Sequence, residues 1–365
     1  MKVDETIPKI DVLIGVEKPS ALIEENNIFD GVKEILEKIR PNWPVEKIKY
    51  KLLTDGITNK LIGCNVEGEN EEETVLVRIY GNKTDLLIDR KAETRNILLL
   101  NKLSLAPQLY ATFHNGLAYQ FVPGITLSSK TVIKPEIYKL VARRMARMHK
   151  VKNDINPKKC TPCLWNKMQR FLDLVPHDFT DPRKQKRFLE LNLPKKVDLQ
   201  KEKEFLKHYL SQNEPLVVFA HNDLLLGNVI YTEKSNNVTF IDFEYAGFNY
   251  QAYDIGNHFA EFAGVDNVDY SYYPNKQLQY DWLKTYLEEF NDKIVTECDI
   301  EELYILVNKF ALAAHLFWGI WCLIQAEHSY IDFDFLKYAQ QRLGEYFTKK
   351  PEYLALGLQE HPNKL

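Results

Sequence analysis

The sequence has 365 residues, 45% of them hydrophobic and 27% charged, and a formal net charge of −4 at pH 7. This length suits about two domains, and the ordinary apolar fraction excludes collagen-like, low-complexity and disordered chains. The 51 Asp and Glu residues outnumber the 47 Lys and Arg residues. Because proteins that bind nucleic acid or anionic lipid usually carry a basic excess, we expect no nucleic-acid partner.

The N-terminal residues predict no export signal. They mix charged and apolar side chains and lack the basic segment followed by an apolar segment that a signal peptide needs. The five cysteines are an odd, thinly spread set, which favours a reducing compartment. The longest uncharged run, Phe310–Ala326, is shorter than the roughly 20 residues of a membrane span. We therefore expect a cytoplasmic protein without stable membrane insertion.

The first part of the chain combines short β-like runs with helical patterns. Apolar residues at helical spacing predict a helix within residues 31–39, and Pro41 ends it. A turn-rich segment and a His-Asn-Gly hairpin signal separate the predicted strands that follow. These strands are Ile48–Thr54, Leu61–Val66, Thr74–Tyr80, Gln108–Phe113 and Leu117–Val122, with a helix predicted over Asp85–Ser104.

After Pro123-Gly124 the pattern is mainly helical, apart from a β-rich island at Leu216–Phe243. The mixed-charge stretch Arg183–Lys207 is predicted to be a solvated face or loop. The predicted helices are Pro135–Lys150, Leu199–Leu210, Leu278–Phe290, Ile300–Ala326 and Phe335–Phe347. We therefore expect an N-terminal extension over 1–47, a small β-rich lobe over 48–123, and a larger helical lobe over 124–365.

The β-rich island carries the polar residues with the most specific spacing. An apolar strand leads into His221-Asn222-Asp223, and Asn228 follows five residues after Asp223. A predicted hairpin then ends at Asp242, which should lie near Asn228 because the second strand returns beside the first. Oxygen ligands of this kind suit Mg²⁺, which binds through one or two carboxylates and substrate phosphates.

This spacing indicates phosphoryl transfer, which needs a metal clamp and a carboxylate that orients the attacking hydroxyl. The layout is that of the kinase H-R-D-x-x-x-x-N loop followed by a metal-binding Asp. Any one of Asp223, Asn228 and Asp242 alone would be interpreted as a turn or capping residue. The three together, between apolar strands, favour kinase chemistry.

From about Ile48 to about Phe347 the chain resembles the choline/ethanolamine kinase family. The resemblance rests on the loop from His221 to Asn228 and on a longer run from Ile241-Asp242-Phe243-Glu244-Tyr245 to Glu261. It implies an α+β, bilobal protein-kinase-like fold, with a small β-rich lobe that binds ATP and a helical lobe that holds the catalytic loop and an amine pocket. The segments TDGITNKLIGC, VRIYG and EFAGVDNVDYS are most similar to the ethanolamine branch of the family.

The resemblance implies transfer of phosphate from ATP, with Mg²⁺, to ethanolamine, giving phosphoethanolamine at the start of the CDP-ethanolamine route to phosphatidylethanolamine. Two alternatives stay open: a choline or dual-specificity kinase of the same fold, and a catalytically inactive nucleotide-binding module. The expected partner is a small-molecule substrate, and the expected state is a monomer or homodimer.

The resemblance also assigns the catalytic residues. Asp223 is the expected catalytic base, and Asn228 and Asp242 are the expected Mg²⁺ ligands. His221 and Asp254 are expected to be structural residues that brace the catalytic loop.

For ATP, the resemblance implies a phosphate contact from Arg78, with Glu93 on the next helix as its partner. The alternative for Glu93 is a surface carboxylate. Backbone amides of a turn are expected to hold the phosphates, and a hinge segment is expected to bind adenine. The loop residues are Asp55, Gly56, Thr58 and Asn59, and the hinge residues are Gln120 and Val122.

For the amine, the resemblance implies an aromatic wall with an anionic component, because cations bind aromatic faces and carboxylates. Trp318 and Trp321 lie three residues apart and so share a helical face, although on composition alone tryptophans on such a helix are more often core residues. The other expected substrate-binding residues are Tyr270, Tyr338, Glu244 and Glu261.

Overall fold

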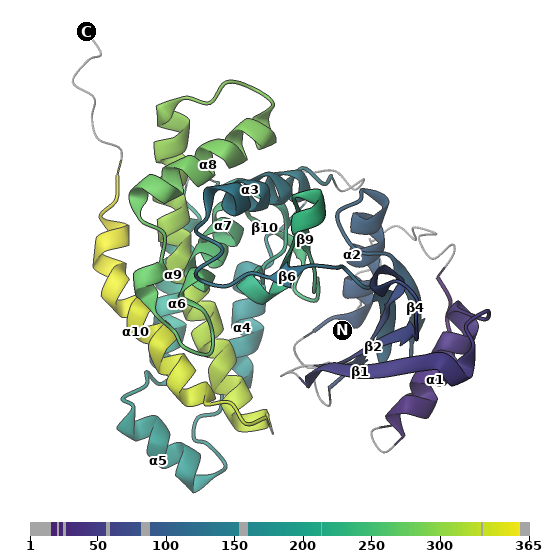
Figure 1. Ribbon diagram of the computed structural model, residues 1–365. Helices are drawn as coiled ribbons and strands as arrows, with labels where there is room; N and C mark the ends of the chain where they lie inside the picture. The colour runs from purple at the N-terminus through teal and green to yellow at the C-terminus, as the bar shows by residue number, and fades with distance from the viewer. Residues whose placement is uncertain are drawn as a thin grey trace. The chain divides into compact units, whose positions relative to one another are not determined.

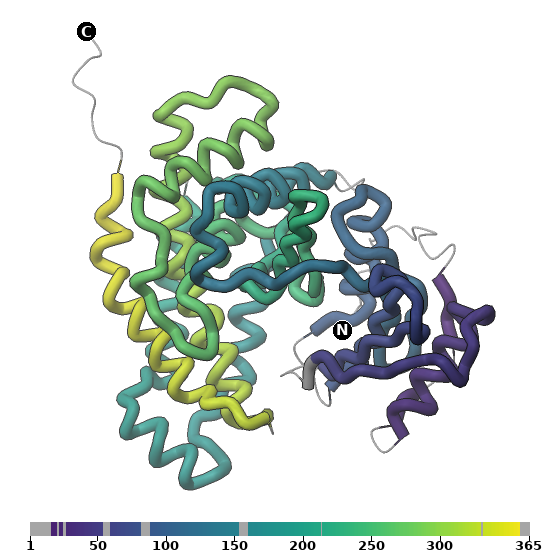
Figure 2. The backbone as a smooth tube through the Cα atoms, in the orientation of Figure 1, coloured from purple at the N-terminus to yellow at the C-terminus, as the bar shows by residue number. Residues whose placement is uncertain are grey.

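A computed structural model gives the arrangement of the chain (Figures 1 and 2). The backbone divides into two compact units, which are described separately. The first unit comprises residues 1–125 and 230–245, and the second comprises residues 126–229 and 246–365. The structure describes residues 16–19, 22–24, 27–55, 59–81, 88–152, 160–212, 214–329 and 331–357.

The first unit is built on a five-stranded antiparallel sheet of order β1-β2-β3-β5-β4. The central strand β3 reads Val-Leu-Val-Arg-Ile-Tyr, and five of its six residues are buried. A strand buried on both faces is normally apolar, so the buried Arg78 within it needs charged partners. The strands are β1 (Ile48–Asp55), β2 (Asn59–Val66), β3 (Val75–Tyr80), β4 (Leu109–Phe113) and β5 (Gly116–Gln120).

Two helices accompany this sheet. Helix α1 (Ile28–Ile39) buries one apolar face, which includes Ile35 and Leu36, in the same core as the β3 side chains. Helix α2 (Arg90–Lys102) begins at Arg90 because the Asp89 carboxylate accepts hydrogen bonds from the amides of Lys91 and Ala92. This start falls within the predicted helix Asp85–Ser104, whose residues 85–87 lie outside the described part of the chain.

The β-rich island contributes the strands β7, β8 and β9 to two small sheets. In the hairpin, β8 (Val229–Thr232) and β9 (Asn237–Phe240) belong to a three-stranded sheet of order β6-β8-β9 with β6 (Ile125–Thr126). In the second unit, β7 (Val217–Ala220) pairs antiparallel with β10 (Gly247–Tyr250). Each pair ends next to functional candidates, because Asp242 follows β9 and His221 follows β7.

The rest of the second unit is helical, with α9 (Glu297–His328) in its core. By length and composition this 32-residue helix could cross a membrane, but 83% of its apolar window is buried inside the protein, as expected of a core helix. Gly256 of α7 (Gln251–Ala260) lets this helix approach α9, because a Cβ there would lie 2.6 Å from the Val307 carbonyl oxygen. The other helices are α3 (Pro135–His149), α4 (Leu164–Leu174), α5 (Pro182–Glu190), α6 (Lys196–Leu210), α7 (Gln251–Ala260), α8 (Lys276–Asn291) and α10 (Phe335–Leu354).

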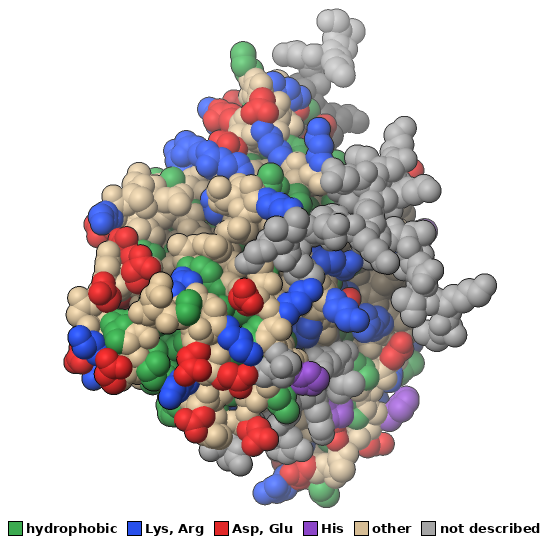
Figure 3. Space-filling model, turned by 90° about the vertical axis from the view of Figure 1, so that its right-hand side faces the viewer, with side chains coloured by type: hydrophobic (Ala, Val, Ile, Leu, Met, Phe, Trp, Pro, Cys, Tyr) green, Lys and Arg blue, Asp and Glu red, His purple; other side chains and the backbone are tan. Residues whose placement is uncertain are grey.

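The observed elements confirm the α+β class. The mixed-charge stretch Arg183–Lys207 is not a loop but belongs largely to α5 and α6. In α5 only Phe188 is buried, and in α6 Lys203 is the one charged residue of the stretch that is buried. On the face drawn in Figure 3, Lys and Arg side chains are interspersed with Asp and Glu, consistent with the balanced composition.

Candidate functional site

In the first unit, two arginines and three carboxylates form a compact group, here called the charged cluster: Arg78, Arg90, Glu93, Asp242 and Glu244. Arg78 on β3 forms an ion pair with Glu93 on α2, and its Nη1 donates to Asp242 Oδ1 at 2.6 Å. Arg90 Nη1 lies 3.1 Å from Glu93 Oε2 and 3.0 Å from Glu244 Oε2. The Arg90 guanidinium also sits 3.8 Å from the centroid of the Tyr80 ring, a cation–π contact.

The electrostatics of the charged cluster follow from burial. Carboxylate oxygens of Glu93, Asp242 and Glu244 all lie within 4.8 Å of one another, and among the described residues the guanidiniums of Arg78 and Arg90 pair with them. Burial, with the Asp242 charge, raises the pKa of Glu244 to about 7 despite the nearby arginines. Burial alone would lower the pKa of Arg78, but the charges of Asp242 and Glu244 outweigh it and raise that pKa. The cluster therefore keeps Arg78 charged and holds its guanidinium in one place.

Asp242 is the most accessible carboxylate of this cluster, with 27% of its side chain exposed against 0% for Glu93 and 4% for Glu244. Its backbone is left-handed, with φ of 62°, which is uncommon for a residue other than glycine. Such strain persists where the surroundings impose it, often at functional positions. A partly exposed carboxylate oxygen is also the ligand type that Mg²⁺ prefers.

The predicted nucleotide loop is described only in part. Gly56 and Thr58 lie outside the described residues, and of Asp55 only the strand position is described. Asn59 Nδ2 donates to Glu244 Oε2 at 3.5 Å, so the start of β2 contacts the charged cluster. In the predicted hinge, Gln120 ends β5, its amide donates to the Gln108 carbonyl at 2.8 Å, and Val122 is half-buried.

In the second unit, the loop that carries Asp223 is tied to a buried carboxylate. Asp254 of α7 is fully buried and accepts from the amide of His221 at 2.9 Å and from the amide of Asn222 at 2.6 Å. Burial alone would raise the pKa of Asp254, but the hydrogen bonds that it accepts from the His149 side chain and the His221 amide help to outweigh burial, and that pKa is lowered. Asp254 is therefore a permanent anion that fixes the backbone just before Asp223.

Asn222 itself is held in the left-handed region, with φ of 67°. Its side-chain oxygen accepts from Asn249 Nδ2 at 2.7 Å, and its Nδ2 donates to the Gly247 carbonyl at 3.3 Å. Its carbonyl accepts from Asn257 Nδ2 at 3.5 Å. Because so many bonds fix this one residue, the direction in which the chain enters Asp223 is determined.

Asn228 closes the same loop. Its Nδ2 donates to the Asp223 carbonyl at 2.9 Å, and the residue is buried. An amide that donates through nitrogen presents its remaining oxygen as an acceptor. An amide oxygen is a hard donor of the kind that suits Mg²⁺, so the chemistry of the Asn228 side chain fits this ion.

Most of the predicted amine-binding residues belong to the second unit, where aromatic side chains connect several of them. The Trp318 and Trp321 rings are 5.7 Å apart, and Trp318 Nε1 donates to Asn257 Oδ1 at 2.7 Å. Ring contacts continue from Trp321 through Phe335 and Phe333 to Tyr338. Since Asn257 also contacts Asn222, one series of contacts joins the Asp223 loop to this aromatic wall.

Glu261 lies close by, but its charge is already paired. Its Oε1 accepts from Arg342 Nη1 at 2.7 Å, and both side chains are almost fully buried. Burial alone would lower the pKa of Arg342, but the Glu261 charge outweighs it and raises that pKa. The Tyr270 hydroxyl is also buried, without a hydrogen-bond partner among the described residues.

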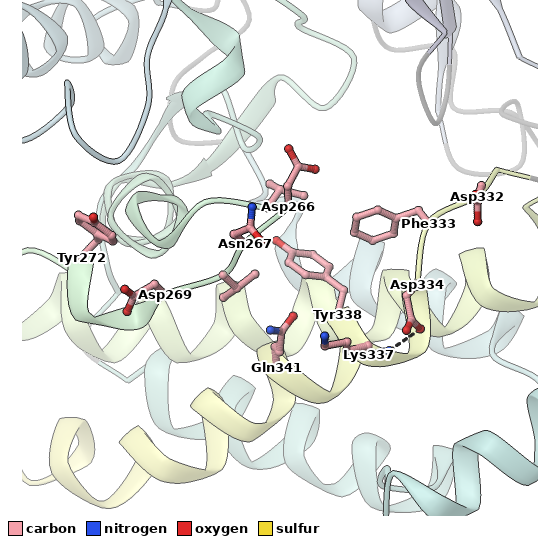
Figure 4. A pocket seen from close by; sticks show the side chains of 12 residues that line it. Asp266, Asn267, Asp269, Tyr272, Asp332, Phe333, Asp334, Lys337, Tyr338 and Gln341 are labelled. Carbon is pink, nitrogen blue, oxygen red and sulfur yellow. Dashed lines mark hydrogen bonds between the residues drawn. The ribbon is translucent and has the colours of Figure 1, made fainter.

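A pocket of about 820 Å³ opens beside Tyr338 (Figure 4). Its aromatic lining is Tyr272, Phe333 and Tyr338. Among the described residues, the carboxylates of Asp266, Asp269, Asp332 and Asp334 line it together with Lys337. Asp334 is ion-paired with Arg187 and Asp269 accepts from the Ser271 amide, whereas Asp266 and Asp332 have no ion pair or hydrogen bond within the described part of the chain. We call this cavity the acidic pocket.

Comparison with known proteins identifies the family of this chain. A sequence profile of the choline/ethanolamine kinase family matches residues 50–347. The chain belongs to this family.

The chain is 47% identical over 361 residues to ethanolamine kinase 1 of Mus musculus, an alignment that covers 97% of this chain and 96% of the mouse protein. It is 45% identical to ethanolamine kinase of Drosophila melanogaster, with 92% of this chain and 79% of the fly protein covered. Among solved structures, the Plasmodium vivax ethanolamine kinase is 29% identical with a TM-score of 0.78, over 88% of this chain and 89% of that one. Choline kinase of Cryptosporidium parvum follows at 25% identity and a TM-score of 0.74, over 89% of this chain and 96% of that one. The expected protein-kinase-like fold is thereby confirmed.

Sequence reasoning missed several residues of this family member's site. Arg90 could have been found, because it precedes Glu93 by three residues on one helix and so shares a face with it. Asn257 and Arg342 gave no local signal, because their partners lie 61 and 81 residues away in the chain. The acidic pocket was also missed, since its carboxylates come from two separate segments.

Proposed function

We propose that this chain transfers the γ-phosphoryl group of ATP to the hydroxyl of ethanolamine, releasing ADP and phosphoethanolamine. The observation that carries this proposal is the 47% identity to a mouse ethanolamine kinase over nearly the full length of both chains. The product is the first intermediate of the CDP-ethanolamine route to phosphatidylethanolamine. We further propose a cytoplasmic enzyme that acts as a monomer or homodimer.

The proposed catalytic base is Asp223, which lies half-buried behind a rigid loop. A fixed carboxylate positions the substrate hydroxyl for in-line attack and accepts its proton. We propose His221 and Asp254 as the residues that brace this loop, which agrees with the hydrogen bond from the His221 amide to Asp254.

We propose Asn228 and Asp242 as ligands of Mg²⁺, supported by the oxygen chemistry of their side chains. When bound, the ion would neutralise the developing charge on the phosphates. Arg78 would add a fixed positive charge toward the phosphates, and the buried Glu93 would hold it in place.

The ATP-binding part is proposed to be residues 48–123, and the catalytic and amine-binding part residues 124–365. Within the first, the proposed phosphate loop is Asp55, Gly56, Thr58 and Asn59, and the proposed adenine hinge is Gln120 and Val122. The described contact of Asn59 with Glu244 joins the loop to the charged cluster, which supports a phosphate-facing role.

For the amine, we propose a wall formed by Trp318, Trp321, Tyr270 and Tyr338. Ethanolamine carries three N–H donors that need acceptors, unlike the quaternary nitrogen of choline. The buried Tyr270 hydroxyl can accept one such bond. Glu244 and Glu261 were expected to supply the negative charge, but each is already paired with an arginine. The acidic pocket is therefore proposed as the anionic component.

The test is ADP release by the purified protein with Mg-ATP and either ethanolamine or choline. We expect turnover on ethanolamine at least tenfold above that on choline, and loss of turnover by orders of magnitude in Asp223→Asn although ATP still binds. Faster turnover on choline would overturn the substrate, and near-normal activity of Asp223→Asn would overturn the base. No turnover with either amine would favour the inactive module.

A further inference from the structure

A buried polar relay runs from the contact between helices α3 and α8 to the Asp223 loop. His149, the last residue of α3, is 3% exposed. Its Nδ1 lies 2.6 Å from the Tyr286 hydroxyl of α8, and its Nε2 lies 2.9 Å from Asp254 Oδ2. All three side chains belong to the second unit.

Neighbouring groups fix the direction of these hydrogen bonds. The Tyr286 hydroxyl accepts from Gln251 Nε2 at 2.9 Å, so its own proton is free to point at His149 Nδ1. The imidazole then carries its proton on Nε2 and donates it to Asp254. In this arrangement every polar hydrogen of the relay has an acceptor, as buried polar groups require.

The last step of the relay is the Asp254 carboxylate. The oxygen that accepts from His149 also accepts from the His221 amide, and the other oxygen accepts from the Asn222 amide. The rotation of this carboxylate therefore sets the position of Asn222, whose left-handed backbone would relax if the carboxylate turned. Asp223 is the next residue in the chain.

We propose that His149 and Tyr286 are positioning residues for Asp223, acting through Asp254. They lock the Asp254 carboxylate in the rotation that holds the Asn222 backbone and so aim the Asp223 side chain. This inference rests on the proposed role of Asp223 as the base. Because misplacing a catalytic group by about 1 Å can cost about a hundredfold in rate, a small turn of Asp254 should be visible in kcat.

A matched pair of tyrosines tests the proposal. Tyr286→Phe removes one hydroxyl of the relay, between α8 and α3. Tyr138→Phe removes one hydroxyl that joins the same two helices through Asp281, at 2.5 Å, but has no path to the loop. We expect kcat to fall about tenfold in Tyr286→Phe, with the KM values for ATP and ethanolamine within about twofold, and to stay within about twofold in Tyr138→Phe.

His149 gives a second comparison. His149→Gln keeps an N–H donor that can reach Asp254, whereas His149→Leu removes it. We expect kcat to fall about a hundredfold in His149→Leu and to be partly restored in His149→Gln. Equal kcat values in Tyr286→Phe and Tyr138→Phe, or equal losses of kcat in His149→Gln and His149→Leu, would mean that the relay only stabilises the helices. Either result would overturn the proposal.

Amide hydrogen exchange tests the relay without turnover. In Tyr286→Phe the His221 and Asn222 amides should exchange at least about tenfold faster, while the amides of α8 keep their rates. Unchanged exchange at both amides would contradict the proposal even if the variant were slow. Because this measurement uses no substrate, it stays decisive if the wild-type protein fails to phosphorylate ethanolamine, an outcome that would instead refute the proposed function.

Discussion

The two units hold their functional groups with different chemistry. In the first unit, Arg78 is fixed by full charges, because carboxylates surround it within a buried cluster. In the second unit, Asp254 is fixed by two backbone amides and His149, and no Lys or Arg pairs with it in the described part of the chain. A group proposed to contact phosphate is thus kept ionised by opposite charges. A loop that must only keep its shape is held by directed hydrogen bonds.

The largest effect should come from breaking the charged cluster at Arg78. Arg78→Met leaves Glu93 and Asp242 without their main partner, which costs about 3–5 kcal/mol of unfolding free energy. Activity should fall by about 10²–10³-fold because a charge aimed at the phosphates is lost. Denaturant unfolding and kcat/KM for ATP measure the two effects.

Arg40→Met is the control, because it also removes one guanidinium from the first unit, one that lies over the Tyr110 ring at 4.1 Å. It should leave kcat/KM for ATP within about twofold. If Arg78→Met kept the same kcat/KM as Arg40→Met, the charged cluster would have no role at the phosphates.

The almost fully buried ion pair between Glu261 and Arg342 in the second unit offers the next comparison. Glu261→Gln leaves Arg342 buried without a counter-charge and should cost about 3–5 kcal/mol of stability, whereas Glu261→Gln with Arg342→Met should regain most of it. If Glu261 only neutralises Arg342, the double variant keeps an ethanolamine KM within about threefold of the wild type. A KM raised far more in the double variant would restore Glu261 as a direct ligand of the amine.

His258, a neutral side chain that contacts the Asp223 loop, should make the free energy of unfolding depend on pH. Burial lowers the pKa of His258 to about 4, and its Nδ1 contacts the Leu224 carbonyl at 2.9 Å. The unfolded chain binds a proton at this residue below pH 6.5 and the folded chain does not. Stability is therefore lost as the pH falls from about 6.5 toward 4, by up to about 1.4 kcal/mol per pH unit.

Urea unfolding at pH 7, 6 and 5 measures this slope, and His258→Gln should reduce it. An identical slope in the variant would assign the whole pH dependence to other groups, such as the carboxylates whose pKa values are lowered. The folded Asp223 loop would then be compatible with a charged His258. The difference between this loop, held by neutral hydrogen-bonding groups, and the ionised charged cluster would disappear.

How far the sequence predicts this molecule depends on the range of each interaction. The spacing of Asp223, Asn228 and Asp242 is local to one β-rich island, so it is visible in the chain and points to a kinase fold. Helix α5 was not predicted, because its large apolar side chains, Phe188 and Leu189, are adjacent and so show no helical spacing of apolar residues. Arg342 could not be assigned to Glu261, because the partner of a buried charge is set by how the helices pack and not by its neighbours in the chain.

The smallest effect should come from the acidic pocket, where charges are solvated rather than buried. Asp266→Asn removes one carboxylate that has no ion pair or hydrogen bond among the described residues. Because an exposed charge acts through water and salt, it contributes up to about 1 kcal/mol. The ethanolamine KM should therefore rise about threefold to fivefold while the ATP KM stays constant, and the difference should shrink at high salt.

Asp198→Asn on α6 makes the same change in net charge, and that carboxylate lies outside the pocket, beside Lys201. If both variants had the same ethanolamine KM, the acidic pocket would not contribute to binding the ammonium group. That group would then have to be bound by the aromatic wall and the Tyr270 hydroxyl alone.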